Sequence, residues 1–139
     1  MVVVTYTEQL RTNGQDDCLD VTEMVQEAVC RAKIRNGLAT VFVTGSTAGV
    51  TTIEFEPGLV KDLREAVRRL FPEDLRYAHH DAAGDDNGFS HLRASFIGPS
   101  LTIPIVDGRL PLGTWQQIAL IDFDTHPRTR EYIIQVIGG

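Results

Sequence analysis

The spacing of apolar residues constrains the fold of this chain more than any other feature of its sequence. It follows a helical repeat in only two stretches, residues 21–32 and 59–70, each of which would bury one face. Asp20 or Thr22 can cap the first helix, and Asn36-Gly37 is expected to end it. Helices therefore account for only a small part of the expected fold.

Most of the remaining sequence is β-branched or aromatic and bounded by turn residues, which predicts roughly eight short strands. Asp107-Gly108 is a strong hairpin signal, with a short strand beginning at Arg109. Two helices among so many strands indicate a single α+β domain over residues 1–139, mainly antiparallel, with the helices covering one side. The other expected strands are residues 2–6, 38–44, 50–55, 92–97, 101–106, 115–123 and 131–137.

The charge balance bears on possible partners. A net charge of −6 and a pI of about 5.1 argue against a nucleic-acid binder, although they are compatible with a local basic pocket. No apolar run approaches the roughly 18 residues that cross a bilayer, so no membrane association is expected. Residues 1–7 lack the pattern of a secretory leader, and the cytoplasm is the expected location. Cys18 and Cys30 form no CxxC pair.

Titratable side chains concentrate in residues 77–91, which hold three of the four histidines together with three aspartates. Gly84 and Asn87-Gly88 are turn residues, so this segment is predicted to be a loop. Imidazole and carboxylate groups suit a Zn, Mn or Fe site or a general acid/base pair, and the separation of His79 and His91 permits them to converge. The alternative is a set of exposed loop residues without a function.

Small polar residues, 45–49, lie between two expected strands. Their backbone N–H groups and the hydroxyls of Ser46 and Thr47 can cradle an anion. The lysine and the glycine spacing of a Walker loop are missing. A simple tight turn is the alternative.

Two carboxylates, Asp122 and Asp124, lie at alternate positions of an expected strand and so share a face. Such a pair needs a nearby cation, which Arg128 or Arg130 can supply, although either arginine can equally bind phosphate. A solvated strand end is the alternative. Trp115, just upstream, is expected in the core.

Read together, these segments resemble the YjbQ-like family, also called the secondary thiamine-phosphate synthase enzymes. The resemblance covers about residues 38–137, and its motifs are specific in this order and density, although no single one is. The matching segments are residues 46–51 with Glu54, 77–79, 86–87, 91–100, 103–105, 108–110, 112–116 and 122–124.

The resemblance implies a β-sandwich-like α+β fold, a homotrimer, and a pocket formed by the histidine segment and the loop at 45–49, near subunit contacts. It also implies weak thiamine-phosphate synthase activity, which joins a hydroxymethylpyrimidine diphosphate to a thiazole phosphate and releases pyrophosphate. Two positions depart from the family pattern. Gly45 and Phe89 stand where members commonly carry histidine, which leaves His79 and His91 as the remaining imidazoles of that cluster.

Two functions follow as hypotheses. In the first, an enzyme acts on a phosphorylated small molecule with the help of a divalent metal (Zn, Mn or Mg). His79 and His91 would bind the metal or act as acid and base, and Asp86 would support them. In the second, a trimer with a decayed site binds a metabolite or a protein without catalysis. The residues expected at the active site are His79, Asp86, Asn87 and His91, and those expected to hold the phosphorylated ligand are Ser46, Thr47, Gly49 and Arg128.

Overall fold

The computed structural model of the chain describes residues 1–139 and contains seven strands and four helices. This is the α+β class that the sequence predicts, with two more helices than expected. The strands are β1 (Val2–Thr12), β2 (Asp17–Asp20), β3 (Gly37–Val43), β4 (Ala48–Ile53), β5 (Ser100–Ile105), β6 (Gln117–Asp122) and β7 (Arg128–Gly138). The helices are α1 (Thr22–Ala32), α2 (Pro57–Leu70), α3 (Ala78–Ala83) and α4 (Gly88–Ile97).

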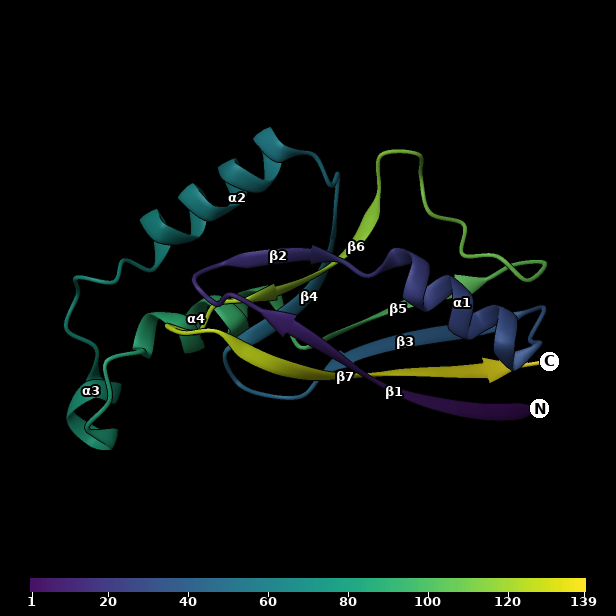
Figure 1. Ribbon diagram of the computed structural model, residues 1–139, viewed down its shortest axis with the longest axis horizontal. Coiled ribbons are helices and arrows are strands. Elements are labelled where there is room, and N and C mark those ends of the chain that lie inside the picture. The colour runs from purple at the N-terminus through teal and green to yellow at the C-terminus, as the bar shows by residue number, and fades with distance from the viewer.

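The strands form two antiparallel sheets (Figure 1). Sheet A has the order β1-β7-β3-β5, and sheet B has the order β2-β6-β4. The main core joins both sheets and α1, with Val41 and Ile134 from sheet A, Leu120 from sheet B and Val29 from α1. The sheets therefore face each other across one apolar layer, as a sandwich-like fold requires.

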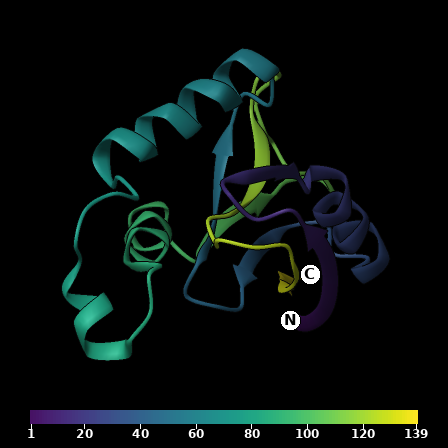
Figure 2. The same cartoon turned by 60° about the vertical axis from the view of Figure 1, so that its left-hand side comes forward.

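A second apolar cluster covers the other face of sheet B, where α2 and α4 pack. Along β6, Ile118 and Leu120 belong to the main core, whereas Ala119 and Ile121 belong to the second cluster. Figure 2 shows β4 and β6 between α1 on one side and α2 and α4 on the other. The helices thus do not share one side, and β6 is a continuous apolar run because both of its faces are covered.

The segment expected to be the histidine loop and a strand at 92–97 instead forms α3, a short connection and α4. The buried residues of α4 include Phe89, Ser90, Arg93 and Ala94, which follow a helical spacing. Arg93 is 1% exposed. Because a charged residue occupies one of the buried positions of α4, the helical spacing of its apolar residues is hard to recognise in the sequence. The strand prediction for 92–97 is therefore wrong.

Smaller differences arise at element ends. α1 begins after Val21 with no side-chain cap and ends at Ala32, where Lys33 takes a left-handed conformation. Gly37 does not end the helix but begins β3. It must be glycine there, because a Cβ would lie 1.9 Å from the Ile137 carbonyl oxygen. Trp115 is 73% exposed ahead of β6, not in the core.

Strand β1 is longer than predicted and reaches Thr12, and β2 includes Asp20, which was expected only as a helix cap. The hairpin at Asp107-Gly108 is confirmed by the bridge between Val106 and Arg109. None of the four helices combines the length and the apolar composition needed to span a bilayer.

Candidate functional site

Three segments that are distant in sequence enclose a polar cavity of about 490 Å³. They are the loop between β3 and β4, the connection from α3 into α4, and the chain around the start of β7. None of the lining residues is hydrophobic. The cavity is lined by Thr44, Gly45, Ser46, Thr47, Asp85, Asn87, His91, Asp124, Arg128, Thr129, Arg130 and Glu131.

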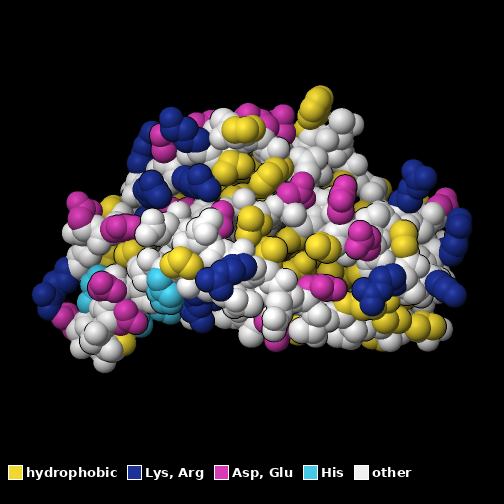
Figure 3. All heavy atoms as spheres, in the orientation of Figure 1, with side chains coloured by type: hydrophobic (Ala, Val, Ile, Leu, Met, Phe, Trp, Pro, Cys, Tyr) yellow, Lys and Arg dark blue, Asp and Glu magenta, His cyan; other side chains and the backbone are white.

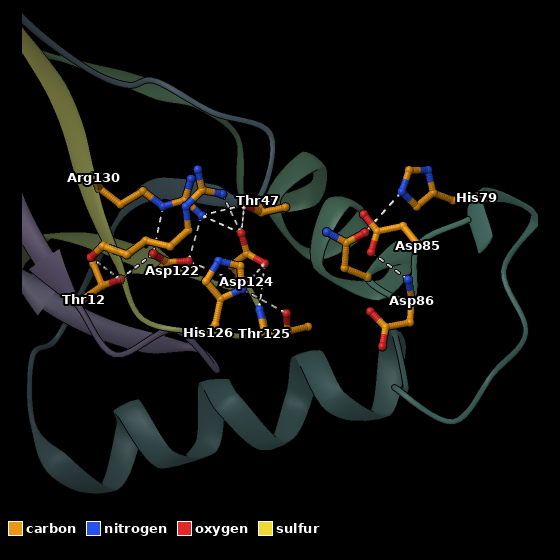
Figure 4. Close-up of polar contacts among 12 residues, drawn as sticks. Thr12, Thr47, His79, Asp85, Asp86, Asp122, Asp124, Thr125, His126 and Arg130 are labelled. Atoms are coloured by element: carbon orange, nitrogen blue, oxygen red, sulfur yellow. Dashed lines mark hydrogen bonds and ion pairs between the residues drawn. The ribbon is translucent and has the colours of Figure 1, made fainter. Parts of the chain in front are cut away.

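Arg130 is the central cation of this cavity, and its side chain is 2% exposed. Its Nε and Nη2 each donate to one oxygen of Asp122, both at 2.8 Å, and Nη2 also donates to Thr47 Oγ1 at 2.5 Å (Figure 4). Its Nη1 donates to no protein group. The guanidinium is therefore held rigidly with one nitrogen left for a ligand.

Gly45 explains why that nitrogen is accessible. A Cβ at this position would lie 2.7 Å from Arg130 Nη1, and the backbone φ of +127° disfavours any other residue. Gly45 thus leaves open space beside the unused donor.

Asp122 is fully buried and holds Arg130 in place. Thr12 Oγ1 donates to Asp122 Oδ2 at 2.5 Å, and the Asp124 N–H donates to Oδ1 at 2.9 Å. Burial alone would raise the pKa of Asp122, but the hydrogen bonds from Arg130, Thr12 and the Asp124 amide outweigh it and hold the pKa below the usual 3.8. The carboxylate is therefore ionised when Arg130 is charged.

Asp124 repeats this arrangement at the rim of the cavity. It accepts from Arg128 Nη1 at 2.7 Å, from the Thr125 N–H at 2.8 Å and from Thr47 Oγ1 at 3.1 Å. Burial opposes ionisation of Asp124, yet these donors, with His126 nearby, lower its pKa below 3.8. Asp122 thus pairs with Arg130, whereas Asp124 pairs with Arg128 and also lies 3.7 Å from Arg130 Nη2. The solvated strand end is excluded because Asp124 is 3% exposed.

The two histidines predicted to converge do so. The ring centroids of His79 and His91 lie 4.6 Å apart, at an interplanar angle of 66°. His91 Nδ1 lies 3.2 Å from the Ser46 carbonyl oxygen. Because a carbonyl only accepts, Nδ1 carries the proton, and Nε2 is the ring atom available for proton exchange when the ring is neutral.

Asn87 joins this pair to a carboxylate. With its amide oriented to satisfy its neighbours, Nδ2 lies 3.2 Å from His79 Nε2 and 3.2–3.3 Å from the two oxygens of Asp85. Asn87 also directly precedes α4, so the positive end of that helix lies at the cavity. Asp85, which the sequence reasoning did not select, is therefore the carboxylate of this group.

Most residues predicted for the site meet here, but two do not. Asp86 faces a different cavity, lined in part by Glu73 and Arg76, and Figure 4 shows its carboxylate turned away from His79. Gly49 lies on β4 beneath α4, where a Cβ would come within 2.7 Å of Ile97 Cγ2. Its role is close packing of α4 on sheet B. The predicted residues that line the cavity are Ser46, Thr47, Asn87, His91 and Arg128, with His79 beside them.

Arg130 and Asp85 are the residues that sequence reasoning undervalued. A signal for Arg130 exists, because Arg130, Tyr132, Ile134 and Val136 alternate along β7 and are all buried. An arginine at a core-facing strand position needs a partner and a purpose. No comparable local signal separates Asp85 from Asp86.

The donor set does not match a metal centre. No group of three or more His, Cys, Asp or Glu side chains is arranged to hold a metal ion. Catalytic zinc takes three protein ligands, and here two imidazoles adjoin an amide. Position 89 does not supply the third ligand either, since the Phe89 side chain is 5% exposed and packs against the Arg93 guanidinium. The metal at His79 and His91 stays a prediction.

These features define a single-domain α+β protein whose polar cavity is built around a buried, ion-paired arginine. Residues 6–139 match the family model described as UPF0047 protein YjbQ-like. The chain belongs to this family, as the motifs in its sequence indicate.

Relatives and solved structures agree with this assignment. A UPF0047 protein of Methanothermobacter thermautotrophicus is 37% identical over 99% of this chain and 94% of the relative. The structure of a hypothetical protein from Aeropyrum pernix K1 superposes with a TM-score of 0.91 at 36% identity, covering 98% and 99% of the two chains. A YbjQ-like protein of unknown function from Sulfolobus solfataricus gives a TM-score of 0.89 at 28% identity over 99% and 100%.

Proposed function

We propose that this protein binds a phosphorylated small molecule in the polar cavity, with Arg130 Nη1 as the anchor for a phosphate oxygen. The observation that carries the proposal is a buried guanidinium that is fixed by Asp122 and Thr47 and keeps one donor unused beside Gly45. A donor held in advance loses little entropy on binding, and arginine matches phosphate geometry.

The surroundings of Nη1 support a hydrogen-bonding ligand over an apolar one, and the carboxylates of Asp85, Asp124 and Glu131 share the lining with the two arginines. The cavity has no hydrophobic lining, Ser46 and Thr44 contribute hydroxyls, and Arg128 lies at the rim. The N-terminal end of α4 adds favourable potential for an anion. The volume of about 490 Å³ lies in the range of small-molecule sites, roughly 300–1,000 Å³.

For chemistry at this site, we propose the weak thiamine-phosphate synthase activity that the family resemblance implies. Release of pyrophosphate requires stabilisation of charge on the departing oxygens, and in this proposal Arg130 Nη1 would supply it. His91 would exchange a proton through Nε2, while Asn87 and Asp85 orient His79. None of these roles depends on a metal.

A non-catalytic binding module is the second candidate. The observation that favours it is the donor set at His79 and His91, which falls short of the three ligands of a catalytic metal. In that case the cavity would bind the same phosphorylated molecule without turnover. The homotrimer implied by the resemblance stays a prediction in both cases.

The test is calorimetric titration of the full chain with inorganic pyrophosphate, followed by an assay for thiamine phosphate from the two phosphorylated substrates. Arg128→Gln is expected to weaken binding about tenfold, as loss of a charge-assisted contact does. The matched control is Arg69→Gln, whose side chain is 82% exposed on α2 and should bind as wild type does.

The histidine separates the two candidates. His91→Gln should abolish turnover with little effect on pyrophosphate binding if the protein is an enzyme. Wild-type binding that Arg128→Gln weakens, without turnover, would support the binding module. An absence of saturable binding in the wild type would refute both.

A further inference from the structure

We propose a second anion-binding site, separate from the polar cavity, between the end of α1 and the turn after β5. A cavity of about 630 Å³ lies there. Figure 1 places both elements at the end of the molecule opposite α3 and α4. The ligand class that we assign to it is a small phosphate ester or diphosphate.

Positive charge is the first reason. Lys33, Arg35 and Arg109 line the cavity, and Asp107 is the only carboxylate that does. Asp107 pairs with Arg35 at 3.5 Å, which leaves Lys33 and Arg109 without an ion pair. On a chain with a net charge of −6, this local excess of positive charge favours an anion. Figure 3 shows Lys and Arg side chains gathered at this end of the molecule.

The helix alone does not account for this cluster. Cations near the C-terminus of a helix offset its dipole, and this explains Lys33 and Arg35 without any ligand. Arg109 comes from a different element, the turn after β5, yet it lines the same cavity. Convergence of cations from two elements is the arrangement that an anion requires.

The walls of the cavity are fixed before any ligand arrives. Gln26 donates through Nε2 to the Gly108 carbonyl at 3.1 Å and accepts from the Leu110 N–H at 3.1 Å. The Gly108 N–H donates to the Arg35 carbonyl at 2.8 Å. These bonds hold the turn against α1, so a ligand would not need to order the backbone.

The accessible lining of the cavity indicates the kind of ligand. Val29 and Ile34 are 0% and 3% exposed and belong to the protein core, so Cys30 is the one exposed apolar side chain of the lining. The surface that a ligand would meet is therefore mainly cationic and polar, as a phosphate or diphosphate group requires. The volume falls in the usual range for small ligands, roughly 300–1,000 Å³.

The test is an NMR titration of the full ¹⁵N-labelled chain with inorganic pyrophosphate at low ionic strength. We expect saturable shifts of the amides at residues 33–35 and 107–109. The variant K33Q/R109Q should weaken this response about tenfold. Lys33 already has a left-handed conformation at φ 56°, and glutamine meets the same backbone there, so the exchange removes charge without new strain.

The control is K61Q/R69Q, which removes the same two charges from α2, where both residues are exposed. It should retain the wild-type response. Linear, non-saturating shifts, or saturation that K33Q/R109Q does not change, would overturn the second site. The amides of residues 45–47 and His91 report on the polar cavity separately, so failure of one site is distinguishable from failure of the other.

Discussion

Two arginines are buried in this protein, and they differ in what remains of their hydrogen-bonding capacity. Arg93 on α4 donates through Nη1 to Asp16 at 2.9 Å, and through Nε and Nη2 to the Phe71 carbonyl at 3.2 and 2.8 Å. Arg130 on β7 donates through Nε and Nη2 only, which leaves Nη1 unused at the polar cavity.

Arg93 therefore has a structural use, whereas Arg130 keeps a donor for a functional one. All three nitrogens of Arg93 bind protein groups, and they tie α4 to the chain before β2 and to the end of α2. Arg130 is held just as firmly, yet one donor faces open space. The presence of a buried ion pair is therefore less informative than its unused donors.

The largest expected effect comes from removing the partner of Arg93. Asp16→Asn should destabilise the fold by about 3 kcal/mol, because a charge that is 1% exposed loses its counter-ion. Urea denaturation gives the free energy of unfolding. Asp107→Asn is the control, since Asp107 also has a positive φ and an arginine partner but is 77% exposed. Its change should stay within about 0.5 kcal/mol, and equal losses would contradict the structural role of Arg93.

A smaller effect on stability, with a large one on binding, is expected at Gly45. Gly45→Ala places a Cβ 2.7 Å from Arg130 Nη1 and should weaken pyrophosphate binding at least about tenfold, measured by calorimetry. Gly98→Ala meets a similar backbone restriction, at φ +96°, but no atom within 4 Å. Both should cost about 1 kcal/mol of stability, and only the first should affect binding. Equal binding by the two variants would remove Arg130 Nη1 as the anchor.

The smallest effect is expected at Thr12, which supports Arg130 through Asp122. Thr12→Val should cost about 1 kcal/mol in urea denaturation, whereas Thr12→Ser should retain most of the stability.

Acid unfolding gives a second test of the contact between Thr12 and Asp122. Since the pKa of Asp122 in the fold lies below 3.8, its ionisation stabilises the protein above about that pH, and this contribution is lost as the pH falls through the lowered pKa. Without the Thr12 donor the pKa of Asp122 rises, so Thr12→Val should begin acid unfolding at a higher pH than wild type. Identical acid transitions for the two proteins would show that Thr12 does not act on Asp122.

Secondary structure was predictable where one face of an element is apolar and the other polar, as in α1, α2 and β3. Prediction failed where a polar residue lies in the buried stripe. Arg93 broke the apolar period of α4, and Asp16, 1% exposed with φ 68°, lies in a stretch to which the sequence assigned neither a helix nor a strand. In both cases the partner that makes burial tolerable is distant in sequence, so no local pattern reports it.

The candidate site was predictable in its residue types and only partly in its geometry. Ser46, His91 and Arg128 line the cavity as expected, because small hydroxyls, imidazole and guanidinium are typical of ligand sites. The exchange of Asp86 for Asp85 depends on the backbone path between α3 and α4, where adjacent residues face different cavities. The two neighbouring aspartates have the same side chain, and only the direction in which each side chain points distinguishes them.

By itself, the sequence determined the fold class, the family and most of the segments that form the cavity, because apolar spacing and motif order are local properties. The tertiary structure decided which donors remain free. Thr12 and Asp122 are 110 positions apart, and Arg93 and Asp16 are 77 apart. Whether an arginine nitrogen is used or open depends on such distant contacts, and these exist only once the two sheets and the helices have packed together.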